Sequence, residues 1–408
     1  MPYLRKKIAV LGLGEESRDV LAWLKTDSRA CQVTVIDPFK NQDLTGYNLI
    51  FRSTGIWRLH SRILAAKTAG AEISSATKLF FRLCPCPIIG VTGTKGKGTT
   101  ASLIRTILTA GGKQGFLAGN IGRPMLALLP QLYASSFICL ELSSFQLQDL
   151  TISPHIAVVL NITQDHLDIH RSLQEYRQAK TNLVRWQTPA DHAVINRASP
   201  VSRSFSRLTR AQIHWFNDRL TGLDLKQLQL IGRHNLENIS AALTVAAICG
   251  IPRPVALRAV YNFKGLEHRL ELVREFQEVR YYNDSASTTP ETAIAAIKAF
   301  TQPLVIILGG SDKRADYSLL GKTIITSKQV KAVVLIGKMG PKIGEALAGF
   351  PGKIIKGARS MKQILNQAKA VAAAGDVVLL SPGCASFDLF KNYRDRGEQF
   401  KKNVNQLH

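Results

Sequence analysis

A glycine- and lysine-rich segment, GVTGTKGKGTT at residues 90–100, is the strongest chemical signal in the chain. It follows the apolar run PIIGV and precedes ASLIRTILTA, a stretch that predicts a helix. A glycine-rich loop between a strand and a helix presents backbone N–H groups and the positive helix end to a phosphate. Lys97 would then face the β- and γ-phosphates of a nucleotide. A plain glycine turn is the alternative.

Residues that could hold Mg²⁺ stand at the end of this loop and at the end of another apolar run. Gly98 follows Lys97 where a serine or threonine usually binds the metal, so Thr99 or Thr100, or a bridging water, would have to replace it. The apolar run FICLE ends in Glu141, which predicts a carboxylate at the end of a strand. Taken alone, Glu141 would more simply be a solvated turn residue.

A third apolar run, within IAVVLNITQDHLD at residues 156–168, is followed by Asp165, His166 and Asp168. The carboxyl ends of parallel strands meet at one edge of a sheet, so this group, Glu141 and the phosphate loop are expected to form one crevice. His166 alone would more simply be a structural hydrogen-bonding residue.

The N-terminal segment resembles a dinucleotide-binding turn in part. Gly12 and Gly14 stand between an apolar run and a helical pattern, but Ser17 replaces the third glycine. The next run, VTVID, ends in Asp37 near the usual ribose-binding spacing. The pattern predicts a Rossmann-like domain suited to a nucleotide diphosphate, with a simple strand-to-helix turn as the alternative.

Two polar loops near the C-terminus also follow apolar runs, in LGGSDKRADY and LLSPGCASFDLFKNYRDRGEQF. Lys313 and Arg314 in the first could pair with a substrate carboxylate or lie in solvent. Ser386 in the second precedes DLFKNYRDRG, and we expect it to cap a helix there.

Eight near-continuous apolar runs separated by helix-length segments predict an α/β fold with parallel sheets covered on both faces. Prolines in CPCP and the segment FKGLEHRLE, which precedes the alternating strand VREFQEVRYYND, suggest three domains: 1–86, 87–266 and 267–408. We expect a Rossmann-like N-terminal domain and a central domain in which the phosphate loop follows a strand of a parallel sheet.

Composition narrows the class of protein further. The formal charge of +24, from 53 Lys and Arg against 29 Asp and Glu, favours anionic partners. The basic residues are scattered and aromatic residues make up 7%, which argues against nucleic acid. Six cysteines exclude a disulfide scaffold. No leader and no long apolar stretch stand out, so we expect a cytoplasmic protein without membrane association.

The motifs GVTGTKGKGTT, ELSSFQL, NITQDHLD, YRQAK, GRHNLEN, GLEHRLE, NDS, LGGSDKRADY and SPGCASFDLFKN occur in this order. Over essentially the whole chain they resemble the Mur ligase family of peptidoglycan synthesis, and most of all its glutamate-adding members. The resemblance implies a monomeric ligase that uses ATP and Mg²⁺ to join glutamate, in its D form, to UDP-N-acetylmuramoyl-L-alanine. It also implies a Rossmann-like N-terminal domain that binds the UDP-sugar, a central P-loop-type ATPase domain with a parallel sheet, and a C-terminal Rossmann-like domain that receives the amino acid.

The resemblance also implies a role for individual residues. Lys97, Glu141, His166 and Lys180 would be catalytic, and Lys180 would carry a carbamate that helps to hold magnesium together with Thr99, Glu141 and His166. The implied ATP contacts are Gly93, Thr94, Lys95, Gly96, Lys97, Gly98, Thr99, Asn235, Arg269 and Asp284. Those for the UDP-substrate are Gly14, Asp37, Ser53, Thr54, Gly55 and Asn120, and those for the amino acid are Thr288, Lys313, Ser386, Phe387 and Tyr393.

Two positions depart from the family pattern. Gly98 lacks the hydroxyl that normally follows the loop lysine, and Ala286 stands where the glutamate-adding members have lysine. Three alternatives therefore stay open: a ligase that adds another amino acid such as L-glutamate, an inactive homologue, and a nucleic-acid-binding protein with a phosphate loop.

Overall fold

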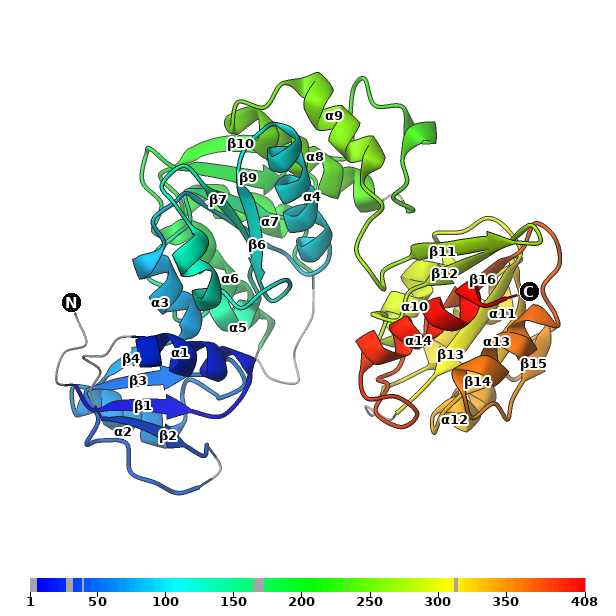
Figure 1. Ribbon diagram of the computed structural model, residues 1–408, viewed down its shortest axis with the longest axis horizontal. Helices are drawn as coiled ribbons and strands as arrows, with labels where there is room; N and C mark the ends of the chain where they lie inside the picture. Colours follow the sequence, from blue (N-terminus) through cyan, green and yellow to red (C-terminus); the bar gives the residue numbers. More distant parts are fainter. Residues whose placement is uncertain are drawn as a thin grey trace. The chain divides into compact units, whose positions relative to one another are not determined.

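The computed structural model describes residues 6–26, 32–38, 40–163, 172–232, 234–311 and 315–407. The chain forms two compact units, the first made of residues 1–227 with 234–263 and the second of 228–233 with 264–408. Three sheets organise them, two in the first unit and one in the second (Figure 1). The predicted α/β class is confirmed, while the three domain boundaries stay predictions.

The first sheet is parallel, with strand order β2-β1-β3-β4. Its central strands β1 and β3 are apolar runs that are fully buried, as the sequence predicts for parallel sheet. The elements of this part are β1 (Ile8–Leu11), α1 (Glu15–Thr26), β2 (Val33–Ile36), β3 (Leu49–Arg52), α2 (Ser61–Thr68), β4 (Glu72–Ser74) and α3 (Ala76–Leu83).

The second sheet is also parallel, with strand order β10-β9-β8-β5-β7-β6. Strand β5 leads into the phosphate loop, β7 ends in Glu141, and β8 leads into the NITQDHLD segment. These three strands are neighbours in the order β8-β5-β7. The strands are β5 (Ile88–Thr92), β6 (Gly115–Gly119), β7 (Phe137–Glu141), β8 (Ile156–Val159), β9 (His192–Asn196) and β10 (Gln212–Phe216). The helices are α4 (Lys97–Ala110), α5 (Ser144–Leu147), α6 (Leu173–Arg185), α7 (Pro200–Ser204), α8 (His234–Ile248) and α9 (Arg253–Asn262), with short 3₁₀ turns at Leu126–Gln131, Phe205–Arg207 and Leu225–Gln227.

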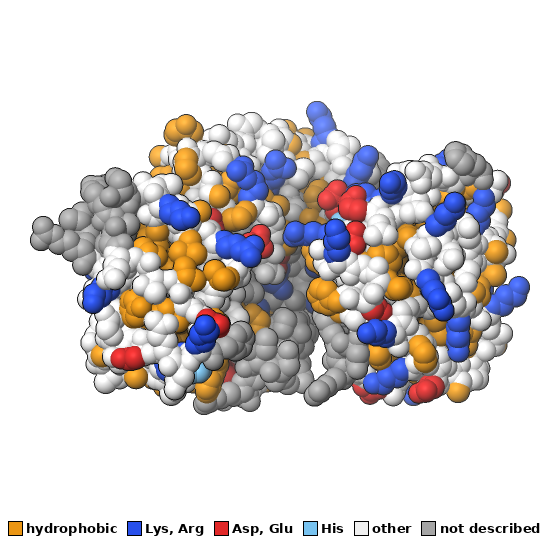
Figure 2. Space-filling model, turned by 60° about the horizontal axis from the view of Figure 1, so that its bottom comes forward, with side chains coloured by type: hydrophobic (Ala, Val, Ile, Leu, Met, Phe, Trp, Pro, Cys, Tyr) orange, Lys and Arg blue, Asp and Glu red, His pale blue; other side chains and the backbone are white. Residues whose placement is uncertain are grey.

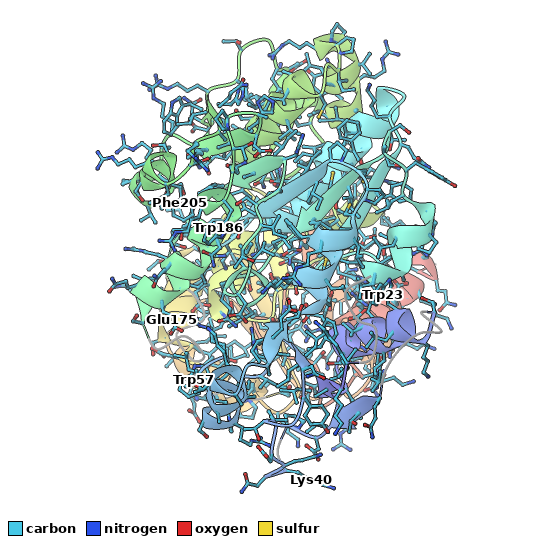
Figure 3. The ribbon with its side chains drawn as sticks, turned by 90° about the vertical axis from the view of Figure 1, so that its left-hand side faces the viewer. Trp23, Lys40, Trp57, Glu175, Trp186 and Phe205 are labelled. Carbon is cyan, nitrogen blue, oxygen red and sulfur yellow. The ribbon has the colours of Figure 1, made fainter. Side chains whose placement is uncertain are left out.

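One hydrophobic core joins the first two sheets, which explains why they form a single unit. Val10 and Phe51 of the first sheet belong to the same buried cluster as Leu140 of the second. Trp23 of α1 packs against this cluster from the side (Figure 3). Arg52, which is almost fully buried, adds an ion pair with Asp149.

The third sheet, in the second unit, has strand order β11-β12-β16-β13-β14-β15. All its pairings are parallel except β11 with β12. Its strands are β11 (Glu271–Phe276), β12 (Val279–Asn283), β13 (Leu304–Gly309), β14 (Val330–Ile336), β15 (Lys353–Ile355) and β16 (Val377–Leu380). Its helices are α10 (Pro290–Ile297), α11 (Ser318–Thr326), α12 (Gly340–Ala346), α13 (Met361–Lys369) and α14 (Tyr393–Asn405).

Two local predictions for this unit are wrong. The segment VREFQEVRYYND is a hairpin rather than one strand, because Gln277 and Glu278 both adopt positive φ (50° and 58°) and reverse the chain. Ser386 does not cap a helix, because the following helix begins only at Tyr393. Its cap is Asn392, whose side chain accepts a hydrogen bond from the backbone N–H of Asp395.

Lys and Arg side chains are spread over both units on the face shown in Figure 2, without a single continuous stripe. Among the described residues, no helix has both the length and the apolar character needed to cross a membrane.

Candidate active site at the carboxyl ends of the strands

The phosphate loop turns from β5 into α4 at Gly96, which has φ 84° and directly precedes the helix. A Cβ at Gly96 would lie 2.3 Å from Oδ1 of Asn238 in α8, so both the backbone angle and the available space require glycine. The loop and the helix N-terminus therefore lie at the carboxyl end of β5, as the sequence predicts, and the Thr94 N–H already donates to the Asn161 carbonyl.

Asn238 also decides which threonine of the loop is available. The Thr100 hydroxyl donates to Oδ1 of Asn238 over 3.1 Å, and Nδ2 of Asn238 donates to Oδ1 of Asn235 over 2.8 Å. Thr100 is fully buried, whereas Thr99 is half-buried. Of the two candidates for the missing hydroxyl after Lys97, Thr99 is the more accessible, and its role as the replacement stays a prediction. The sequence analysis did not single out Asn238, although it lies in the GRHNLEN motif.

Lys97 and Glu141 meet at this edge from neighbouring elements. Nζ of Lys97 lies 4.0 Å from Oε1 of Glu141 and donates to the Thr94 carbonyl over 3.0 Å. Both side chains are largely buried, at 17% and 7% exposure. Asn120 belongs to the same group, because its Nδ2 lies 3.4 Å from Oε1 of Glu141 and its N–H donates to the Glu141 carbonyl. Its contact with the UDP-substrate stays a prediction from the resemblance.

Lys180 of α6 lies directly beneath the loop. Its Nζ donates to the Gly93 carbonyl over 2.9 Å and to the Thr92 hydroxyl over 3.3 Å, and it lies 4.7 Å from the ring centre of Tyr176. The side chain is fully buried. Tyr176, which the sequence analysis missed within YRQAK, reaches the Thr94 hydroxyl at 3.0 Å. Asp165, His166 and Asp168 lie outside the described residues.

The first sheet gathers most of the residues that the resemblance assigns to the UDP-substrate. Gly12 has φ 84°, and a Cβ there would lie 3.4 Å from Oγ of Ser53. The Thr54 N–H donates to Glu16 at the start of α1, and Glu16 also accepts from Gln146 of α5. Gly14 precedes α1, Asp37 follows β2, and Gly55 lies in the loop after β3. Ser17, in place of a third glycine, is buried and donates to the Leu11 carbonyl.

In the second unit, three loops meet where strand order reverses between β13 and β16. The backbone N–H of Gly309 donates to the Pro382 carbonyl, and the N–H of Ser311 donates to the Ala385 carbonyl. Asp284, at the end of β12, accepts from the hydroxyls of Ser287 (2.5 Å) and Ser381 (2.7 Å). Such switch points are where open α/β sheets bind ligands.

Burial raises the pKa of Asp284 to about 6, although the two serine hydroxyls, the Leu270 N–H and the Arg269 charge lower it in part. Arg269 itself is exposed. Among the residues predicted for the amino acid, Thr288 is half-buried, Ser386 is buried, and Phe387 and Tyr393 are exposed. Lys313, with Arg314, lies outside the described residues.

His268 and Arg396 shape the NDS loop, and the sequence analysis gave neither a role. Nδ1 of His268 lies 2.9 Å from Nδ2 of Asn283, and its backbone has φ 63°. Arg396 is fully buried and donates to the hydroxyl (2.9 Å) and carbonyl (2.8 Å) of Ser285. Burial lowers the pKa of Arg396 to about 10 and also lowers that of His268. The apolar spacing of α14 gave no sign of a buried arginine.

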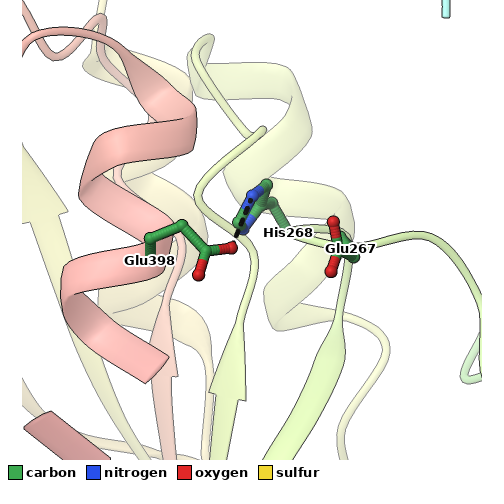
Figure 4. Close-up of side chains that lie close together, drawn as sticks. All are labelled: Glu267, His268 and Glu398. Carbon is green, nitrogen blue, oxygen red and sulfur yellow. Dashed lines mark ion pairs between the residues drawn. The ribbon is translucent and has the colours of Figure 1, made fainter. Parts of the chain in front are cut away.

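The side chains of Glu267, His268 and Glu398 lie close together in Figure 4, with their ligand atoms within 4.8 Å of one another. A cation already serves this cluster, since Nζ of Lys401 lies 3.2 Å from Oε1 of both glutamates. Burial lowers the pKa of Lys401, but its bonds to Glu398 and Glu267 outweigh this and raise it. The cluster is an ion-pair network that secures the start of the second unit.

The fold and the site define a nucleotide-dependent α/β enzyme with a phosphate loop, a buried carboxylate beside the loop lysine, and a second sheet in its C-terminal unit whose strand order reverses between β13 and β16. Comparisons with known proteins make this class specific. Residues 91–217 match the family model for the Mur ligase middle domain, and residues 268–384 match that for the Mur ligase glutamate ligase domain.

Relatives match over nearly the whole chain. The UDP-N-acetylmuramoylalanine–D-glutamate ligase of Acetivibrio thermocellus is 37% identical over 454 residues, covering 98% of this chain and 97% of the relative. The ligase of the same name from Symbiobacterium thermophilum is 38% identical and covers 90% of this chain and 86% of its own. The chain belongs to the Mur ligase family.

Solved structures share the architecture. UDP-N-acetylmuramate-alanine ligase MurC from Thermotoga maritima superposes with a TM-score of 0.63 at 15% identity, covering 98% of this chain and 100% of that one. MurF ligase from the same organism, in complex with ADP, gives 0.63 at 17% identity, covering 99% and 96%. At these identities the likeness speaks for the fold.

Proposed function

We propose that this chain uses ATP to join D-glutamate to UDP-N-acetylmuramoyl-L-alanine through an amide bond. The observation that carries the proposal is the placement of Lys97 and Glu141 4.0 Å apart at the mouth of a phosphate loop. The names of the relatives at 37% and 38% identity support the choice of substrates.

The reaction divides into two steps. An oxygen of the alanyl carboxylate attacks the γ-phosphorus of ATP, and the bond from this phosphorus to the β,γ-bridging oxygen breaks. ADP leaves, and the alanyl carboxylate becomes an acyl phosphate. The glutamate nitrogen then attacks the acyl carbon, loses a proton, and expels inorganic phosphate. Two anions meet in the first step, so the Lys97 ammonium and the loop N–H groups have to offset charge and hold the phosphates in line.

The residues at the loop fit a hard divalent cation such as Mg²⁺. The Glu141 carboxylate and the Thr99 hydroxyl are oxygen donors of the kind this ion prefers. Lys180 is a further candidate through the carbamate that we propose for it. A carbamate on Lys180 would add two anionic oxygens and keep one N–H for the Gly93 carbonyl. Bound Mg²⁺ would neutralise charge on the transferred phosphoryl group.

The UDP-sugar role of the first domain and the amino-acid role of the last follow from the resemblance and remain proposals. A monomeric state and a cytoplasmic location also stay predictions from the sequence.

Phosphate release from ATP tests the proposal, with UDP-N-acetylmuramoyl-L-alanine and each glutamate enantiomer supplied separately. We expect phosphate release to require both co-substrates. The rate of release should be much higher with D-glutamate than with L-glutamate. Lys97→Ala should lower the rate by about 10²–10³-fold, whereas Lys113→Ala, an exposed lysine just after α4, should leave it unchanged. A preference for L-glutamate would identify a ligase of different specificity, and no release with either enantiomer would identify an inactive homologue.

A further inference from the structure

A cavity of ≈ 510 Å³ lies in the second unit, at the carboxyl ends of β14 and β15 and one strand away from the switch point between β13 and β16. Its volume falls in the range of small-molecule pockets. Of the residues predicted for the amino acid, the four within the described part of the chain, Thr288, Ser386, Phe387 and Tyr393, do not line it. The site proposed above for the ligase reaction therefore does not account for this cavity.

After β14 and after β15, the chain places a lysine next to a glycine at the border of this cavity. Gly337 follows β14 with φ 66° and precedes Lys338, while Lys356 follows β15 and precedes Gly357 with φ 96°. A Cβ at Gly337 would lie 2.2 Å from Oδ2 of Asp388, so the turn is closely packed on that side. The neighbouring strands thus bring two lysines to one hollow.

Among the charged residues of the lining, cations outnumber acids. Lys338, Lys356 and Arg359 border the cavity, against Asp388 as the acidic residue. The Asp388 carboxylate is already engaged, since it accepts from the N–H groups of Lys338 and Leu389. Within the described part of the chain, none of the three cationic groups lies within 4.0 Å of a carboxylate oxygen.

Apolar residues form the rest of the wall, among them Leu335, Ala358 and Pro341. A hollow with an apolar wall, two ammonium groups and one guanidinium fork suits a small organic molecule with more than one anionic group. We propose that this cavity binds a small organic anion carrying two phosphate or carboxylate groups. Such a site would also give a use to part of the +24 formal charge.

Lysine footprinting of the full-length protein tests the proposal at the resolution of single residues. The protein is acetylated with an N-hydroxysuccinimide ester, and the rate at each lysine is measured by mass spectrometry. Three probes are compared at equal ionic strength: fructose 1,6-bisphosphate, citrate and 3-phosphoglycerate. Because the readout is site-resolved, binding of a probe at the phosphate loop does not interfere, and failure of the ligase assay would not affect the result.

With the preferred probe at about ten times its Kd, acetylation of Lys338 and Lys356 should slow by about tenfold. Lys353, exposed on β15 and outside the cavity, should be unaffected. The bisphosphate and citrate arms decide between phosphate and carboxylate ligands. Arg359→Gln should raise the half-protecting concentration by about tenfold, whereas Lys362→Gln, with the same charge change at an exposed position, should not.

Unchanged acetylation of Lys338 and Lys356 with all three probes would overturn the proposal. Equal protection of Lys353 would do the same, because it would indicate non-specific screening. Equal behaviour of Arg359→Gln and Lys362→Gln would exclude the guanidinium group from the site.

Discussion

The Thr100 hydroxyl donates a hydrogen bond to Oδ1 of Asn238, 3.1 Å away and 138 positions later in the chain. This contact ties the first turn of α4 to α8 and occupies one of two adjacent threonine hydroxyls behind the phosphate loop. Thr99 and Thr100 therefore have the same chemistry but different environments, and their roles can be separated experimentally.

Thr99→Val should raise the Mg²⁺ concentration needed for half-maximal activity by about tenfold, because a proposed oxygen ligand is lost. Thr100→Val should instead lower the free energy of unfolding by about 1–3 kcal/mol, because the buried Oδ1 of Asn238 loses its donor. Activity at varied Mg²⁺ and chemical denaturation measure the two effects. The reverse pattern would assign the metal to Thr100.

Gly96→Ala should weaken ATP binding strongly, because the new Cβ would need φ 84° and would lie 2.3 Å from Oδ1 of Asn238. Gly112→Ala is a matched control at the other end of α4: its φ is 75°, but a Cβ there meets nothing within 4 Å. The control should lose only about 1–2 kcal/mol of folding free energy through backbone strain, and it should keep its affinity for ATP. Calorimetric titration with ATP distinguishes them, and equal affinities would show that the loop tolerates a displaced Asn238.

Lys180→Ala should lower activity by about 10²-fold or more, because the carbamate we propose would supply negative oxygens beside transferred phosphate. Small added carboxylates such as acetate should restore part of the rate by entering the vacated space. The measurement is phosphate release with and without acetate, in buffer containing bicarbonate. If Lys180→Ala retained full activity in bicarbonate-free buffer, the carbamate would be excluded.

Asp284 should make stability depend on pH in the direction opposite to an ordinary surface carboxylate. Because burial raises its pKa to about 6, above the ordinary value of an aspartate, the folded state keeps the proton at a pH where the unfolded chain has released it. The resulting cost is absent below about pH 4, grows between pH 4 and 6, and is complete above that range, on the order of 3 kcal/mol.

Relative to the parent, Asp284→Asn should therefore gain thermal stability as pH rises from 4 to 7. The hydrogen bonds that the variant loses lower its stability equally at every pH and do not change this trend. Asp316→Asn serves as the control, since hydrogen bonds from Ser318 lower the pKa of this exposed carboxyl. Its stabilising contribution is present at neutral pH and is lost as pH falls through the low pKa. That loss falls below about pH 4, so between pH 4 and 7 the Asp316→Asn curve should stay parallel to that of the parent. Melting temperatures across this range distinguish the two variants, and parallel curves for them would contradict the assignment.

The sequence by itself determined the parallel α/β class and the phosphate loop. Runs such as IIGVT and FICLE are apolar at successive positions because both faces of their strands are covered, and this property is local enough to read directly. The glycine spacing at residues 93–96 is local in the same sense. It reflects the turn from β5 into α4, although the helix begins at Lys97, four residues before the predicted start at Ala101.

Only the tertiary structure decided the features that depend on distant partners. The turn at Gln277 and Glu278 carries no glycine or asparagine signal, so positive φ there could not be read from the residues. Arg396 is buried because Ser285, 111 positions earlier, satisfies its guanidinium group, and Thr100 is engaged because α8 brings Asn238 to it. Periodicity records which face of an element is buried, but the identity of the group facing a polar side chain depends on how remote segments pack.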